Sequence, residues 1–269
     1  MSAITFQNMK ELPYALEEAV NRLMINVNFT DKNIRNIMVT SSLPDEGKSF
    51  VAVNLWRKLA ESGYRTILVD SDFRNSVMQE RYTFMTDAAK LRGISYFLSG
   101  QISLDEAIYQ TNIPNGDIIP LSETINNPSS LLHGDTYKDM LKTLAQRYDY
   151  VIIDTAPLDA VADGERIASL CDGAILVVRA GSTPKALISE SIKLLERTGC
   201  QILGAVLNRV VTGAGSKYGK YGKYRKYGYG YGYGYGSRHE SGGRSGKKRE
   251  DLKQKRHRAM QRCHDKSDK

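Results

Sequence analysis

The hydrophobic pattern of this chain alternates between short apolar runs and longer segments with helical spacing. The apolar runs predict strands at residues 37–40, 66–70, 117–120, 150–154, 173–179 and 202–207. Between them, the pattern predicts helices over residues 16–29, 49–62 and 135–147. A capping box from Ser103 to Glu106 and a Thr183 cap followed by Pro184 predict two further helix starts. Continuous apolar strands separated by helices indicate an α/β fold, with a mostly parallel sheet flanked by helices.

The segment from Ser42 to Ser49 has the spacing of a phosphate-binding loop, with Ser42 in place of the usual first glycine. It stands between a predicted strand and a predicted helix, which is the context that such a loop requires. Lys48 would reach the β- and γ-phosphates of ATP, and the Ser49 hydroxyl would bind Mg²⁺. The alternative is a chance glycine turn followed by a solvent-facing lysine. The nucleotide-binding residues predicted in this segment are Ser42, Pro44, Asp45, Glu46, Gly47, Lys48, Ser49 and Phe50.

Acidic residues follow two of the predicted strands, at the edge where open α/β sheets bind their ligands. Asp70 and Asp72 end one strand, and Asp154 ends another. A carboxylate is costly to bury unless it meets a cation, and a nucleotide-bound Mg²⁺ would supply one. Alternatively, these residues cap helices or turns. Because Asp70 and Asp72 point the same way along an extended strand, one could hold the metal while the other receives a proton.

Eight of the sixteen tyrosines lie in a segment that has almost no other apolar side chain. Glycine, lysine and arginine separate them, so the rings have no aliphatic neighbours and cannot serve a core. We interpret the eight phenols as phosphate acceptors, since the same chain carries a phosphate-binding loop. These predicted acceptors are Tyr218, Tyr221, Tyr224, Tyr227, Tyr229, Tyr231, Tyr233 and Tyr235.

Charge and composition divide the chain near residue 212. Residues 1–212 contain 21 Lys and Arg against 25 Asp and Glu, whereas residues 213–269 contain 17 against 5. We therefore expect an N-terminal helical segment over 1–33 and a P-loop ATP-binding domain over 34–212. The Tyr/Gly-rich acceptor tail would occupy 213–236, and a basic, disordered extension would occupy 237–269.

The phosphate-binding loop, both acidic segments and the tyrosine cluster together resemble those of the bacterial tyrosine kinases. Members of that family are cytoplasmic autokinases of capsule and exopolysaccharide synthesis. The resemblance implies that Lys48, Asp70, Asp72 and Asp154 are catalytic and that Ser49, Asp72 and Asp154 surround the metal. It favours Asp70 as the base and Asp72 as the metal partner, although the sequence leaves these two roles interchangeable.

Two further residues take a role from the same resemblance. Asn208 would lie near the adenine, or would simply cap its strand. Arg74 completes the Asp-x-Asp-x-Arg form of the second motif and would steady the site or a substrate phosphate. The chain departs from the family at Asn21 and Met24, where the helix that supports ring-shaped oligomers usually has arginines.

The resemblance also implies partners. A transmembrane activator, the polysaccharide co-polymerase, would be a separate chain, and a phosphotyrosine phosphatase would reverse the reaction. We further expect a homo-oligomer that phosphorylates in trans, and no nucleic acid. Three scattered cysteines, no signal-peptide pattern and no long apolar run predict a cytoplasmic protein. The resemblance implies that it reaches the inner face of the plasma membrane through its partner.

Two other functions fit parts of the sequence. A non-kinase P-loop ATPase, of the kind that partitions DNA or positions septa, would share the loop and the fold. Such ATPases usually carry a lysine where this chain has Leu43, and they lack a tyrosine cluster. Alternatively, the basic and aromatic tail could stack on nucleic-acid bases beside an inactive ATP site. The intact set of Lys48, Ser49 and three acidic residues argues against that alternative.

Overall fold

Nine strands form one sheet in the computed structural model, which describes residues 2–125, 128–159 and 162–210. All of these residues belong to the first of two units into which the chain divides, Met1–Gly219. The strands are β1 (Ala3–Phe6), β2 (Asn36–Ser41), β3 (Thr66–Ser71), β4 (Phe84–Thr86), β5 (Tyr109–Thr111), β6 (Gly116–Ile119), β7 (Tyr150–Thr155), β8 (Gly173–Arg179) and β9 (Gln201–Asn208).

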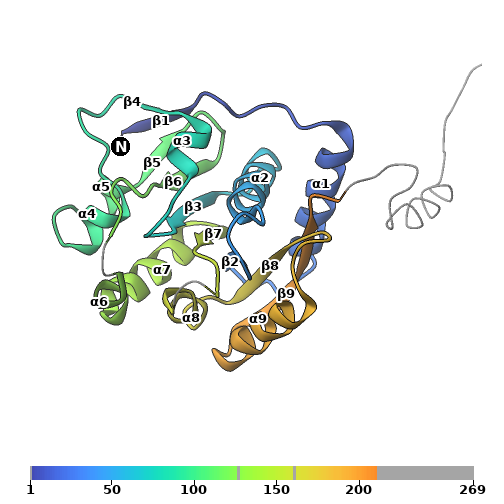
Figure 1. Ribbon diagram of the computed structural model, residues 1–269. Coiled ribbons are helices and arrows are strands. Elements are labelled where there is room, and N and C mark those ends of the chain that lie inside the picture. Colours follow the sequence, from blue (N-terminus) through green and yellow to red (C-terminus); the bar gives the residue numbers. More distant parts are fainter. Residues whose placement is uncertain (1, 126–127, 160–161, 211–269) are drawn as a thin grey trace, which may run out of the picture. The chain divides into compact units, whose positions relative to one another are not determined.

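The sheet order is β4-β1-β5-β6-β3-β7-β2-β8-β9 (Figure 1). The six strands from β6 to β9 in that order are all mutually parallel. Antiparallel pairing occurs only at the other end among the described strands, between β5 and β6 and between β1 and β4. The α/β fold with a mostly parallel sheet, predicted from the apolar runs, is therefore confirmed.

Helices cover both faces of the sheet (Figure 1). They are α1 (Tyr14–Asn28), α2 (Lys48–Glu61), α3 (Met78–Tyr82), α4 (Ile94–Leu98), α5 (Leu104–Ala107), α6 (Pro128–His133), α7 (Asp135–Arg147), α8 (Asp163–Ala168) and α9 (Lys185–Arg197). The first three pack on one face, and α4 to α9 pack on the other. In β2, Met38 joins the core on the α4–α9 side, while Ile37 and Val39 join the opposite core. Because a hydrophobic core covers each face of the sheet, the central strands are apolar on both sides and do not alternate apolar with polar residues.

Most predicted elements lie within two residues of their observed bounds, and the predicted spans of α7 and β8 match the observed ones. The capping box at Ser103 is present and opens the one-turn helix α5. The Thr183 cap is wrong: Pro184 precedes α9, and no side chain caps this helix. The Thr183 hydroxyl instead donates to the buried Glu46 carboxylate, so it points to the loop after β2 and leaves the first amides of α9 without a side-chain acceptor.

The N-terminal segment contributes a strand as well as the predicted helix. β1 pairs with β4 and β5, so residues 1–33 contain part of the sheet. Phe6 anchors this strand, because its ring centroid lies 5.4 Å from that of Trp56 and 4.7 Å from that of Phe84. The domain boundaries at 33, 212 and 236 stay predictions.

The described helices include none with the length and apolar character needed to cross a membrane. Cys171 and Cys200 are buried and unpaired, and Cys263 lies outside the described residues.

Replacing Phe6 with Ala should lower the free energy of unfolding by about 3–5 kcal/mol, because the ring is buried in an aromatic cluster. Chemical denaturation measures this change. The matched control is Phe29→Ala, since that ring is 85% exposed and its loss should change stability by less than about 0.5 kcal/mol. Equal effects of the two substitutions would show that β1 does not depend on the cluster.

Candidate active site

The phosphate-binding loop connects β2 to α2, as the sequence predicts, and ends at a glycine whose backbone conformation and close surroundings disfavour any side chain. Gly47 has a φ of 96°, in the left-handed region, and directly precedes α2. A Cβ atom at this position would lie 2.1 Å from Nδ2 of Asn208. That same Nδ2 donates to the Glu46 carbonyl at 2.8 Å. The end of β9 therefore contacts the loop through the Asn208 side chain.

A buried carboxylate fastens this loop to β8. Glu46 is 2% exposed, and one of its oxygens accepts a hydrogen bond from the Leu43 N–H at 2.9 Å. The other oxygen accepts from the Arg179 N–H at 3.3 Å and from the Thr183 hydroxyl. Ser42, at the start of the loop, accepts a hydrogen bond from the Ser191 hydroxyl at 2.8 Å. The Glu46 side chain thus holds the loop in shape, and this contribution was not part of its predicted role.

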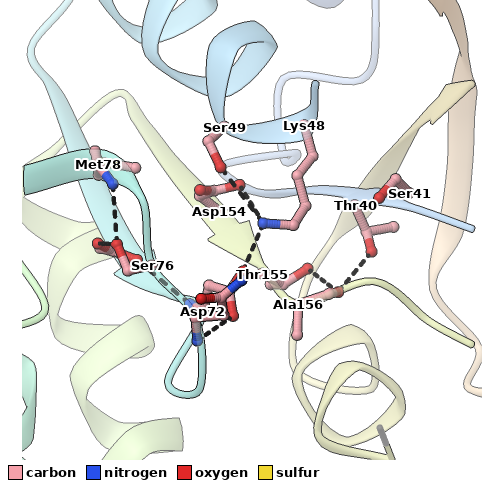
Figure 2. Close-up of polar contacts among 12 residues, drawn as sticks. Thr40, Ser41, Lys48, Ser49, Asp72, Ser76, Met78, Asp154, Thr155 and Ala156 are labelled. Atoms are coloured by element: carbon pink, nitrogen blue, oxygen red, sulfur yellow. Dashed lines mark hydrogen bonds and ion pairs between the residues drawn. The ribbon is translucent and has the colours of Figure 1, made fainter. Parts of the chain in front are cut away.

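Lys48 lies among carboxylates at the ends of two neighbouring strands (Figure 2). Its Nζ is 2.6 Å from Oδ2 of Asp72, 3.9 Å from Oδ1 of Asp154 and 3.4 Å from Oγ of Ser49. Burial tends to lower the pKa of the ammonium, but the charges of Asp154 and Asp72 outweigh it and raise the pKa. Lys48 is therefore a charged ammonium group that two carboxylates hold inside the site.

Asp70, the third acid at these strand ends, is only 1% exposed. It stands opposite Asp154 in the parallel register of β3 and β7, so the two acids are neighbours in the sheet. One Asp70 oxygen accepts a hydrogen bond from the Ser76 hydroxyl, and the other accepts from the Asp72 N–H at 3.4 Å. Burial, followed by the nearby Asp154, raises the pKa of Asp70 to about 7.

The donor set suits a nucleotide-bound magnesium ion better than a free one. The described residues contain no group of three or more acidic, His or Cys side chains that could hold a metal alone. Mg²⁺ is usually held by one or two carboxylates together with substrate phosphates. Asp154 fits this role, because its Oδ1 is buried without a hydrogen-bond partner and its pKa is raised by burial. Ser49 and Asp72, beside it, supply the other predicted ligands.

A pocket of about 280 Å³ opens over these residues. Several predicted residues line it, namely Pro44, Asp45, Gly47, Lys48, Ser49, Asp72 and Arg74. The remaining predicted residues, Ser42, Glu46, Phe50, Asp70, Asp154 and Asn208, are not among its lining. Sequence reasoning missed Arg81, Arg209, Ala156 and Pro157 as lining residues. Arg209 directly follows Asn208 and has a φ of 55°, in the left-handed region. No sequence pattern around it indicates that it lines the pocket. The eight predicted acceptor tyrosines lie outside the described residues.

Known proteins are similar to this chain in sequence and in fold. The model of the AAA domain family matches residues 18–179, which is more than half of the chain. The tyrosine-protein kinase CpsD of Streptococcus pneumoniae is 38% identical over 212 residues, which cover 79% of this chain and 92% of CpsD. The chain belongs to the bacterial tyrosine kinases.

Relatives of other lengths and solved structures agree with this assignment. The bacterial tyrosine kinase etk of Escherichia coli K12 is 33% identical over 75% of this chain, which spans only 27% of etk. The VpsO kinase domain superposes with a TM-score of 0.67 at 28% identity, over 73% of this chain and 95% of that domain. The septum-determining protein MinD of Pyrococcus horikoshii, complexed with Mg-ADP, superposes with a TM-score of 0.55 over 65% of this chain and 70% of its own. At 23% identity, MinD shows the shared fold alone.

In the kinase without nucleotide or magnesium, Asp70→Asn should stabilise the fold at pH 8. The folded state holds the Asp70 pKa near 7, whereas the ordinary value is 3.8. Stability contributed by the protonated acid is therefore lost as pH rises from about 4 to 7, and above pH 7 the cost of the charge is fully present. The gain should be on the order of a few kcal/mol at pH 8 and should shrink toward pH 4.

Thermal and chemical unfolding across this pH range measures the effect. Asp139→Asn is the control, because that carboxylate is 64% exposed on α7. A stability gain for Asp70→Asn that does not vary with pH would contradict the assigned pKa.

Proposed function

We propose that this kinase binds ATP with Mg²⁺ in the pocket over Lys48 and transfers the γ-phosphoryl group to tyrosines of its own C-terminal segment. The observation that supports this most directly is the buried cluster of Lys48, Asp72 and Asp154 beside the phosphate-binding loop. One lysine faces several carboxylates there, so the site as it stands needs further positive charge, which a nucleotide-bound Mg²⁺ would bring.

In the proposed reaction, phosphates draw Lys48 away from Asp72, and the amides at the start of α2 hold them in place. Mg²⁺ would neutralise charge on the β- and γ-phosphates while Ser49, Asp72 and Asp154 hold it. The tyrosine oxygen forms the new bond to the γ-phosphorus as the bond from that phosphorus to the β,γ-bridging oxygen breaks. ADP leaves with the electron pair of the broken bond.

We assign the base role to Asp70. Its pKa is near 7, so it can accept the phenol proton at neutral pH, whereas Asp72 already serves as the partner of Lys48. The Ser76 hydroxyl donates to Asp70 in the present structure, and a phenol hydroxyl would take that place before transfer. Asn208 contacts the loop through the Glu46 carbonyl, which supports a place near the nucleotide.

The biological setting is proposed by analogy with the family. We infer that the kinase regulates synthesis or export of a capsular or extracellular polysaccharide. A transmembrane activator would bring this cytoplasmic chain to the inner face of the plasma membrane, and a phosphatase would oppose it. Transfer would occur in trans within a homo-oligomer.

Replacing the eight tail tyrosines by Phe should remove most of the label that the chain takes from γ-labelled ATP and Mg²⁺ in the presence of its activator. Phosphate mapping should place the label between residues 218 and 235. Tyr14→Phe is the control, since that phenol is 75% exposed but lies outside the tail. Label that remains after the eightfold substitution would place the acceptors elsewhere. Release of phosphate without any labelled tyrosine would favour the non-kinase ATPase.

A further inference from the structure

A buried carboxylate outside the recognised motifs holds one arginine of the nucleotide pocket. Nε of Arg74 donates to Oδ2 of Asp163 at 2.8 Å. The Asp163 side chain is 4% exposed, whereas that of Arg74 is 40% exposed. Within residues 2–125, 128–159 and 162–210, Asp163 is the only carboxylate within ion-pair distance of Arg74.

The other oxygen of the same carboxylate is also occupied. The Ser129 hydroxyl donates to Oδ1 of Asp163 at 2.9 Å. Ser129 lies on α6, Asp163 begins α8, and Arg74 follows β3, so three separate elements meet at this carboxylate. Because both oxygens have a donor, the position of the carboxylate is fixed from two sides, and the carboxylate in turn holds the Arg74 guanidinium at Nε.

Arg74 lines the nucleotide pocket together with Lys48 and Ser49. It lies two residues after Asp72, which contacts Nζ of Lys48, so Arg74 belongs to the loop at the phosphate side of the pocket. A guanidinium has five N–H donors, and Nε uses one of them on Asp163. The remaining N–H groups are therefore available to a phosphoryl group in the pocket.

A purely structural ion pair explains this arrangement less well. Removing an aspartate from water costs several kcal/mol, and an ion pair with a half-exposed arginine returns little of that cost. A role in orienting Arg74 accounts for both the burial of Asp163 and the exposure of Arg74. The buried Asp163 carboxylate holds Nε in place, and the exposed part of the guanidinium keeps its other N–H donors for a ligand.

We propose that Asp163 is a positioning residue, which with Ser129 holds the Arg74 guanidinium toward the terminal phosphoryl group of ATP. This proposal rests on the proposed function in that the pocket takes ATP. It adds that ADP, which lacks the terminal group, gains nothing from Arg74. The pair therefore gives the pocket a preference for ATP over ADP.

The test measures the dissociation constants of ATP and ADP, each with Mg²⁺, for the full chain and its variants by calorimetry. Arg74→Ala should reduce the preference for ATP about tenfold, and Asp163→Asn should reduce it by a similar factor. The double variant should match Arg74→Ala alone to within about twofold, because Asp163 acts only through Arg74. Ser129→Ala, which leaves the ion pair intact, should give a smaller loss and should fold even where Asp163→Asn does not.

Arg57→Ala is the control, because Arg57 pairs with Glu61 on α2 and does not line this pocket. The proposal is overturned if Asp163→Asn keeps the full preference for ATP, or if the double variant loses clearly more than Arg74→Ala. Equal affinity of the unmodified chain for ATP and ADP would overturn it as well. These measurements need no acceptor, so a failure of tyrosine labelling would count against the proposed function and not against Asp163.

Discussion

The site depends on one constraint: a single buried lysine has to balance several buried acids. The parallel pairing of β3 and β7 places Asp70 and Asp154 side by side, and the loop after β3 adds Asp72. Only Lys48 lies within ion-pair distance of any of these three carboxylates in the part of the chain that the structure describes. Burial and repulsion by the neighbouring acids raise the pKa of Asp70. The fold therefore holds carboxylates in an unfavourable environment at the place where cations and phosphates are expected to bind.

Much of this arrangement follows from local sequence. The phosphate-binding loop and the acids after β3 and β7 could be predicted, because each stands directly after an apolar run and parallel strands end at one edge of the sheet. The strands β1, β4 and β5 could not, since they have only three or four residues and no strong period.

The contacts that shape the pocket depend on residues distant in sequence, which no local pattern reveals. Thr183 looks like a helix cap, yet its hydroxyl binds Glu46, 137 residues away. Ser129 and Arg74 both bind Asp163 only because α6, α8 and the loop after β3 come together in the fold. The same holds for Arg81 and Arg209, whose neighbours give no sign that they line a pocket.

The ion pair between Lys48 and Asp72 has one more consequence. Asp72 competes with any incoming anion for the Lys48 ammonium, which its Oδ2 contacts at 2.6 Å. A small anion that makes few contacts, such as inorganic phosphate, should therefore compete poorly with Asp72 for Lys48. A ligand with several phosphates would gain further contacts from the amides at the start of α2. We therefore expect the resting ion pair to weaken the binding of small anions at Lys48.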